Sequence, residues 1–257
     1  MHRPPTPVTS RDLLAPVLRD VRAFVFDTDG VITDSARVHA AAWKTAFDAF
    51  LRVHPPQDPD RGRPFDVRDD YLRYVDGKSR LDGAAAFLDS RGIDAPAETV
   101  RAVAADKERL FTERLRVHGV AAYPGTVRLV RALRRAGVPR AAASASRHAG
   151  ELLDRAGVLD LFDVLVDGGE AARLGLPGKP RPDLFEEAVR RLGVPAGRAA
   201  VVEDALAGVE AGHRGGFALV IGVDRAADPE TAERLLQHGA DIVVPDLGEL
   251  LVQGASK

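Results

Sequence analysis

Residues 26–35 of this 257-residue chain read FDTDGVITDS, and they follow a short apolar run, VRAFVF at 21–26. β-Branched and aromatic residues make that run typical of a buried strand. Asp27 and Asp29 therefore lie at the carboxyl end of the strand, where open α/β sheets bind their ligands. Because residues two apart point to the same side of an extended strand, both carboxylates are expected to face one ligand. Gly30 then allows the backbone to turn sharply away.

The closeness of these two carboxylates indicates a kind of chemistry. Two like charges at this spacing repel each other unless a cation lies between them or one of them is protonated. Both arrangements suit phosphoryl transfer, in which one carboxylate attacks and a second acid moves a proton.

The composition is that of an ordinary soluble globular protein, with 45% hydrophobic and 29% charged residues. The length fits one large domain, or a core with a smaller partner. A formal net charge of −2 creates no field that would attract nucleic acid or an anionic membrane. The absence of cysteine excludes disulfides, thiolate catalysis and cysteine-bound zinc. No segment is apolar enough for a signal peptide or a membrane span, so we predict a cytoplasmic location.

The segment after the first strand is predicted to be helical. Residues 36–50 place apolar side chains at helical spacing. Further helices are predicted, after a proline-rich loop at 53–66, at residues 69–75, 81–90 and 97–115. Because no convincing strand pattern occurs in this stretch, we predict a helical cap domain, 35–121, inserted into a core domain of residues 1–34 and 122–257.

From residue 124 onward, helix and strand patterns alternate. Strands are predicted at 140–143, 164–166, 199–202, 217–223 and 242–244, and helices at 126–136, 150–156, 183–192 and 207–213, with a helical tail. The alanine-rich 140–143 carries the weakest strand signal, since alanine is a poor strand former. The alternation predicts an α/β fold, a doubly wound parallel sheet with helices on both faces.

Polar side chains follow several of these predicted strands. Ser144 with Ser146, Lys179, and Glu203 with Asp204 are expected to join the two aspartates at one edge of the sheet. Each residue alone has an ordinary explanation, such as a helix N-cap or an acidic first turn. Their convergence predicts an active site.

The order of these segments resembles the haloacid dehalogenase-like superfamily of phosphotransferases. The first motif, DxDG, is present at 27–30, and the second is a serine at the end of a strand, Ser144. The third is Lys179 before a proline-containing helix start, and the fourth is the acidic pair at 203–204. The resemblance runs from about residue 21 to 223, and it is closest to the β-phosphoglucomutase-like subgroup.

The resemblance implies a role for each motif residue. Asp27 would be the nucleophile, which forms an aspartyl-phosphate, and Asp29 would be the general acid and base. Ser144 and Lys179 would hold the oxygens of the transferring phosphoryl group. The resemblance also implies a Mg²⁺ cofactor, whose hard oxygen ligands would be Asp27, the backbone carbonyl of Asp29, Glu203 and Asp204.

The resemblance further implies a substrate site between core and cap. Arg80 falls at the position that grips the non-transferring phosphate, a task suited to a planar bidentate donor, and Lys78 adds a second positive charge. His148 departs from the asparagine often found at its position, and Glu108, beside the cap lysine Lys107, replaces another asparagine. The other implied substrate-binding residues are His39, Trp43, Gly77, Ser79, Ser146 and Arg147. For Trp43, a place in the cap core fits the sequence equally well.

Two functions fit these residues. One is a mutase that interconverts β-glucose 1-phosphate and glucose 6-phosphate through glucose 1,6-bisphosphate, and the other is a sugar-phosphate phosphatase with water as the second acceptor. The core motifs serve both. Lys78, Arg80, Ser146 and Arg147 favour the mutase, which must hold a second phosphate and exclude water. A non-catalytic binding module is disfavoured because every motif position keeps its chemistry. The expected partner is a small phosphorylated sugar, and the expected state is a monomer.

Overall fold

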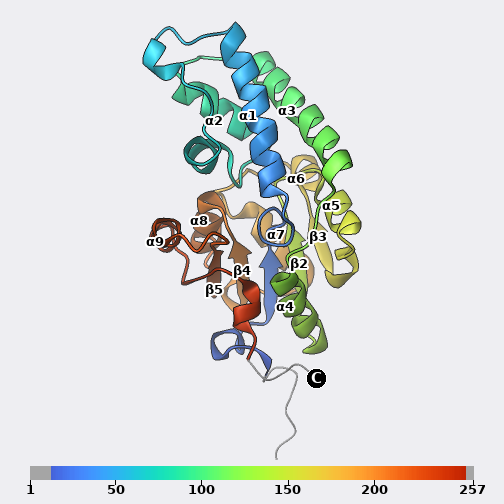
Figure 1. The fold of residues 1–257 in the computed structure, drawn as a ribbon. Coiled ribbons are helices and arrows are strands. Elements are labelled where there is room, and N and C mark those ends of the chain that lie inside the picture. Colours follow the sequence, from blue (N-terminus) through green and yellow to red (C-terminus); the bar gives the residue numbers. More distant parts are fainter. Residues whose placement is uncertain (1–12, 253–257) are drawn as a thin grey trace, which may run out of the picture.

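The computed structural model describes residues 13–252, and its centre is a parallel β-sheet with helices on both faces (Figure 1). The strands of this described part run in the order β3-β2-β1-β4-β5-β6, and all neighbours are parallel. Their bounds are β1 Ala23–Phe26, β2 Arg140–Ala143, β3 Val164–Val166, β4 Ala199–Glu203, β5 Leu219–Val223 and β6 Ile242–Val244. The predicted α/β class is therefore confirmed, including the alanine-rich strand β2.

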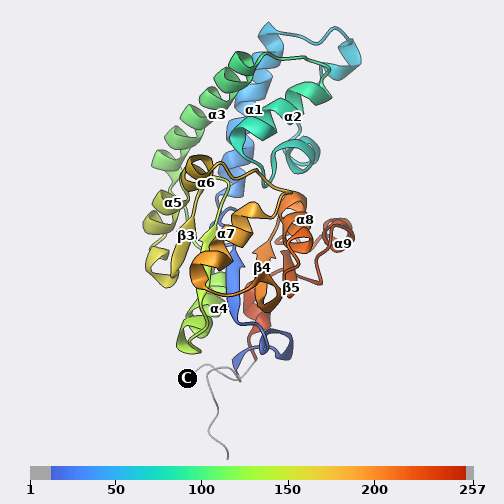
Figure 2. The same cartoon turned by 180° about the vertical axis from the view of Figure 1, so that it is seen from behind.

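The central strand β1 divides the core into two apolar layers. Phe24 and Phe26 point into one layer, and Ala23 and Val25 point into the other, as the period of two requires. The first layer is covered by α4 Pro124–Arg135 and α5 Ala149–Arg155, and the second by α7 Asp183–Leu192, α8 Leu206–Arg214 and α9 Pro229–Gln237. Figure 1 views the molecule from the α4 side, and Figure 2 views it from the α7 side.

A helical region lies beyond the carboxyl ends of the strands (Figures 1 and 2). Its elements are α1 Ala36–Val53, a π-helix at Tyr71–Val75, α2 Arg80–Ser90 and α3 Ala97–His118. These elements share an apolar cluster that is separate from both sheet layers and includes Trp43, Phe47 and Phe87. Among the described residues, no strand occurs between 35 and 121, as predicted. The assignment of this region to a separate cap domain stays a prediction, which the separate cluster supports.

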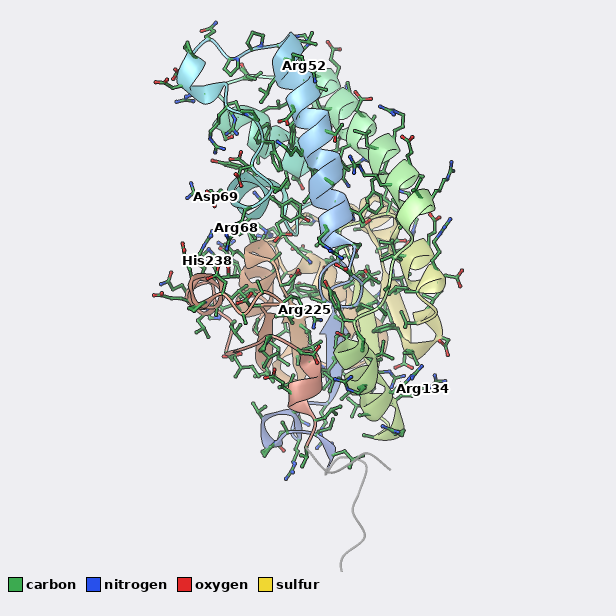
Figure 3. All side chains as sticks on the ribbon, viewed as in Figure 1. Arg52, Arg68, Asp69, Arg134, Arg225 and His238 are labelled. Atoms are coloured by element: carbon green, nitrogen blue, oxygen red, sulfur yellow. The ribbon has the colours of Figure 1, made fainter. Side chains whose placement is uncertain are left out.

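The helical region also contacts the core away from the pocket. Arg68 forms an ion pair of 3.2 Å with Asp228, the residue that caps α9 (Figure 3). This pair joins two parts of the chain that are 160 residues apart.

Some elements differ from the prediction. The helix α6 Gly168–Leu174 was not predicted, because its two initial glycines are poor helix formers. Asp167 nevertheless caps it by accepting hydrogen bonds from the first backbone N–H groups. The helix α9 was also not predicted, although Asp228 caps it and proline occupies its first position.

The ends of the chain are partly outside the described residues. The predicted helical tail contains a short 3₁₀-helix at Leu247–Leu250. Residues 253–257 of that tail and residues 1–12 lie outside the residues that the structure describes. The proline-rich loop carries one 3₁₀ turn at Pro59–Arg61. No helix within 13–252 is long and apolar enough to cross a membrane.

Candidate active site

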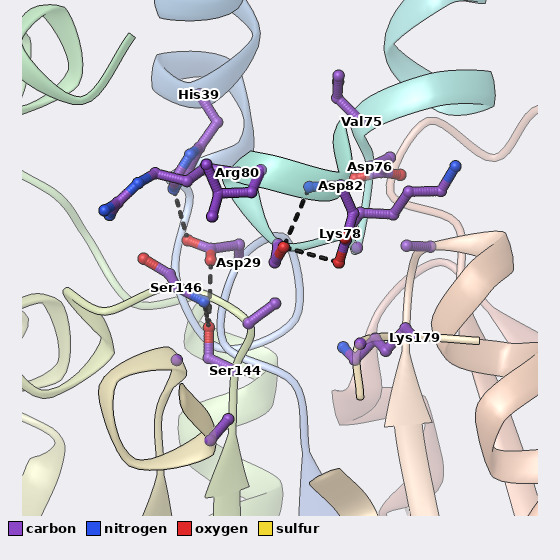
Figure 4. A pocket seen from close by; sticks show the side chains of 18 of the residues that line it. Asp29, His39, Val75, Asp76, Lys78, Arg80, Asp82, Ser144, Ser146 and Lys179 are labelled. Atoms are coloured by element: carbon purple, nitrogen blue, oxygen red, sulfur yellow. Dashed lines mark hydrogen bonds and ion pairs between the residues drawn. The ribbon is translucent and has the colours of Figure 1, made fainter. Parts of the chain in front are cut away.

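A pocket of about 230 Å³ lies between the helical region and the carboxyl edge of the sheet (Figure 4). The predicted site residues that line it are Asp27, Asp29, His39, Trp43, Gly77, Lys78, Ser79, Arg80, Ser144, Ser146, Arg147, Lys179 and Asp204. Glu203 and His148 do not line the pocket, but each contacts a residue that does. The structure therefore brings all the predicted site residues into one region.

Lys179 lies buried between two carboxylates, Asp27 and Glu203. The parallel pairing of β1 with β4 brings these carboxylates to neighbouring strand ends. Lys179 Nζ donates to Asp27 Oδ1 at 2.6 Å and also to Glu203 Oε1. Burial raises the pKa of Asp27 well above its usual range, and the charge of Lys179 opposes that rise. Burial also disfavours the charged form of Lys179, but the two carboxylates outweigh it and raise the lysine pKa. Lys179 therefore stays a cation beside Asp27.

Three carboxylates are close enough together to bind one metal ion. Asp27, Glu203 and Asp204 each offer an oxygen, and these oxygens lie within 4.8 Å of one another. Burial, and then the charges of Asp76 and Glu203, raise the pKa of Asp204 well above its usual range. Carboxylates that are crowded and desolvated in this way suit a hard divalent cation, which would neutralise them. The residues present therefore fit the metal that the fold family implies.

The carboxylate of Asp29 lies between His39 and Ser144 (Figure 4). Its Oδ1 accepts a hydrogen bond from Ser35, and its Oδ2 lies 3.5 Å from Ser144 Oγ. Burial would raise the pKa of Asp29, but His39 and Ser35 outweigh it and lower the pKa to about 2. Asp29 is therefore a carboxylate here, the form that accepts a proton.

His39 and Lys107 form a chain of polar contacts that leads to Asp29. Lys107 Nζ donates to His39 Nδ1 at 2.8 Å, so the ring proton is assigned to Nε2. That atom lies 3.3 Å from Asp29 Oδ1, at ion-pair distance but without the alignment of a hydrogen bond. Burial and Lys107 lower the pKa of His39, and burial lowers the pKa of Lys107 to about 8.

Trp43 belongs both to the apolar cluster and to the pocket. It stacks on Phe47 in the helical cluster, and it also lines the pocket. The two locations expected from the sequence are therefore compatible.

A tight turn brings the loop before α2 onto the start of α8. Gly77 has a φ of +68°, and a side chain there would come within 2.8 Å of the Ala205 Cβ. Ser79 then caps α2, since its Oγ accepts a hydrogen bond from the Asp82 N–H at 3.2 Å. Arg80 is therefore the first residue of α2 and lies at the wall of the pocket (Figure 4).

The loop after β2 is shaped by its own serines. Ser144 Oγ accepts from the Ser146 N–H at 3.1 Å, and Ser146 Oγ accepts from the His148 N–H at 3.2 Å. Arg147, between them, is exposed but lines the pocket. The His148 side chain turns toward the helical region and binds Glu108.

Three further residues near the site were not assigned from the sequence. Asp76 and Tyr71 are polar groups of the helical region, and burial, followed by Glu203, raises the pKa of Asp76 to about 7. Asp76 directly precedes Gly77, a predicted site residue, and this position could have indicated that Asp76 also lies at the site. Arg225 donates to the carbonyls of Gly30 at 3.2 Å and Val31 at 2.9 Å, and so supports the turn after Asp29. Its guanidinium also lies 3.9 Å from the centre of the Tyr123 ring.

Comparison with known proteins agrees with this geometry. Residues 21–216 match the family model described as haloacid dehalogenase-like hydrolase. The chain belongs to this family. It is 41% identical to the β-phosphoglucomutase of Mycobacterium tuberculosis, over 97% of this chain and 98% of that relative. Protein CbbY of Cupriavidus necator is 30% identical over 89% of this chain and 87% of its own length. The crystal structure of a hydrolase from Pseudomonas syringae superposes with a TM-score of 0.73, at 25% identity, over 89% of this chain and 95% of that one.

Proposed function

We propose that this haloacid dehalogenase-like enzyme is a Mg²⁺-dependent β-phosphoglucomutase, which interconverts β-glucose 1-phosphate and glucose 6-phosphate. One observation supports this most. The pocket that contains Asp27 and Asp29 also contains four cationic side chains beyond them, Lys78, Arg80, Lys107 and Arg147. A mutase needs such a second positive region, because its bisphosphate intermediate carries a phosphate at each end. The 41% identity to a β-phosphoglucomutase over nearly the full length also supports it.

In this proposal, Asp27 is the nucleophile. The cycle begins with the aspartyl-phosphate: a sugar hydroxyl attacks its phosphorus, the bond from phosphorus to the Asp27 oxygen breaks, and the Asp29 carboxylate takes the proton of that hydroxyl. In the second step, an Asp27 oxygen attacks the phosphorus at the other end of the bisphosphate, the bond from phosphorus to the leaving sugar oxygen breaks, and that oxygen takes the proton from Asp29. The 2.6 Å contact from Lys179 to Asp27 supports a role in holding the charged oxygens of the phosphoryl group.

The cofactor of this proposal is Mg²⁺, held by Asp27, Asp204 and the backbone carbonyl of Asp29, with Glu203 assisting. When bound, Mg²⁺ would offset the repulsion between the Asp27 carboxylate and the phosphate dianion. Ser144, whose hydroxyl lies 3.5 Å from Asp29 Oδ2, would donate to a phosphoryl oxygen. The cytoplasmic location and the monomeric state stay predictions.

A specific observation favours a sugar-phosphate phosphatase as the second candidate. The carboxylate of Glu108 lies 3.8 Å from Arg80 Nη1, beside the guanidinium expected to bind the second phosphate. A carboxylate at that point repels a phosphate dianion and suits a neutral sugar end. In the phosphatase, water would take the place of the second sugar hydroxyl.

One assay distinguishes the two functions. The enzyme is incubated with β-glucose 1-phosphate, Mg²⁺ and a trace of glucose 1,6-bisphosphate, and glucose 6-phosphate and free phosphate are measured in the same tube. Glucose 6-phosphate with little free phosphate is the expected result. Free phosphate as the main product would replace the mutase with the phosphatase.

A further inference from the structure

Glu108 of α3 connects the cap arginine to the core loop. Its Oε1 accepts a hydrogen bond from His148 Nε2, and the same oxygen lies 3.8 Å from Arg80 Nη1. His148 follows β2, whereas Arg80 begins α2, so one carboxylate oxygen meets two parts of the molecule that are far apart in sequence. The side chain of Glu108 is 26% exposed and lines the pocket.

The surroundings of Glu108 keep it negatively charged. Burial would raise its pKa, but the hydrogen bond from His148 and the charges of His148, Lys107 and Arg80 outweigh it and lower the pKa to about 2. His148 responds in the opposite sense, since its contact with Glu108 raises its pKa. Glu151 also faces His148, at 3.4 Å from Nδ1. At neutral pH, this end of the pocket therefore holds an anion among cations.

This arrangement has the chemistry of an occupied phosphate site. Arginine and protonated histidine are donors that bind phosphate oxygens, and here His148 donates to a carboxylate oxygen of the protein itself, while Arg80 lies at ion-pair distance from the same oxygen. A phosphate dianion that approached Arg80 would meet the charge of Glu108 at close range. Both anions cannot share these donors without strong repulsion.

We propose that the Glu108 carboxylate takes the place of the non-transferring phosphate, as an internal anion, when no sugar phosphate is bound. This carboxylate accepts the hydrogen bond of His148 and pairs with the charge of Arg80, and it has to leave both when a phosphate arrives. Glu108 is therefore a specificity-determining residue: it weakens the binding of every ligand with a phosphate at this end, and it leaves ligands with a single phosphate at Asp27 unaffected. The inference rests on the proposed function, because it takes the Arg80 end of the pocket as the second phosphate site.

Equilibrium binding tests the proposal without turnover. The background is Asp27→Asn with Mg²⁺, and Glu108→Gln is added to it, which keeps the size of the side chain and removes its charge. The matched control is Glu113→Gln, which removes the same charge from an exposed position on the same helix. Calorimetry measures the dissociation constants of glucose 1,6-bisphosphate, of inorganic phosphate and of phenyl phosphate, which has only one phosphate.

The expected result is a decrease of about 10-fold or more in the dissociation constant of the bisphosphate in Glu108→Gln, with less than about a 2-fold change for phenyl phosphate and for the control. If Glu108→Gln tightens binding of inorganic phosphate while no variant binds the bisphosphate, the inference stands and the mutase proposal fails. If the Asp27→Asn protein binds the bisphosphate and Glu108→Gln leaves it unchanged or weakens it, the mutase proposal stands and this inference is overturned. A Glu108→Gln variant that strengthens neither ligand also overturns it.

Discussion

Lys179 Nζ lies 2.6 Å from Asp27 Oδ1 and donates a second hydrogen bond to Glu203, so one buried cation separates two buried carboxylates. Removing one member of such a group destabilises the folded protein, because it leaves an uncompensated buried charge. The lysine that is expected to hold phosphate oxygens therefore also stabilises the fold around the two carboxylates.

The first prediction concerns this group. Lys179→Met is expected to lower the free energy of unfolding by about 3–5 kcal/mol in the absence of divalent metal, because Asp27 and Glu203 then face each other without a cation. Arg109→Met is the control: the exposed Arg109 pairs with Asp106 and Glu113 on its own helix at the surface, and its loss is expected to cost less than about 1 kcal/mol. Urea unfolding in EDTA measures both. Equal losses in the two variants would contradict a special role for the buried lysine.

The second prediction concerns the metal site. Mg²⁺ at about 100 times its dissociation constant should stabilise the protein by about 2.7 kcal/mol, because it binds the folded state and neutralises the crowded carboxylates. Asp204→Asn is expected to lose most of this gain, whereas Glu210→Gln, on the next helix but outside the metal group, should keep it. Thermal unfolding with Mg²⁺ and with EDTA checks the prediction. A full Mg²⁺ response in Asp204→Asn would argue against this carboxylate as a ligand.

The third prediction concerns the second phosphate site. Arg80→Ala is expected to lower kcat/KM for the glucose 1-phosphate reaction by at least about 10-fold more than for hydrolysis of an aryl phosphate, which has no second phosphate. Arg73→Ala, an exposed position of the same region, is the control and should affect neither reaction. Steady-state kinetics of both reactions gives the ratio. Equal decreases of kcat/KM on the two substrates would contradict the role of Arg80 in binding the second phosphate.

The fourth prediction concerns pH. The contact with Glu108 raises the pKa of His148 above 6.5, so the protonated histidine stabilises the folded state. This contribution is fully present below pH 6.5 and is lost as the pH rises through the raised value. Wild type should therefore be more stable than His148→Asn at about pH 6, by less than about 1 kcal/mol since the pair is partly exposed, and the difference should shrink by about pH 9. Unfolding curves at the two pH values measure it, and a difference that grows with pH would have the wrong sign.

The sequence predicts the parts of the fold that depend on local pattern. Strand β1 is a short apolar run followed by a turn, and Asp27 and Asp29 are found at its end because parallel strands present their carboxyl ends at one edge. Strand β2 forms from alanines because its position between β1 and β3 outweighs their low propensity. The helix α6 is missed because its stabilising cap lies in one aspartate, Asp167, rather than in a periodic pattern.

The remainder depends on contacts between distant residues. Glu108 and His148 are 40 positions apart, and no local pattern shows that they meet. Arg225 reaches the carbonyl of Gly30 from 195 residues away, and only the order of strands brings its loop beside the first motif. The burial of Asp76 likewise follows from the docking of the Gly77 turn on Ala205, which is a tertiary contact. The motif chemistry was therefore predictable, and the residues that modulate it were not.

The measurement that tests the central claim most directly is the detection of a covalent phosphoenzyme. The protein is mixed with Mg²⁺ and labelled glucose 1,6-bisphosphate, quenched in acid and digested, and the phosphorylated peptide is identified by mass spectrometry. We predict one hydroxylamine-sensitive, alkali-labile phosphate that survives a cold acid quench on the peptide that contains Asp27, and none in Asp27→Asn, whose turnover should fall below about 1% of wild type while its fold is retained. Turnover without any phosphate on the protein, or a label that persists in Asp27→Asn, would contradict the account.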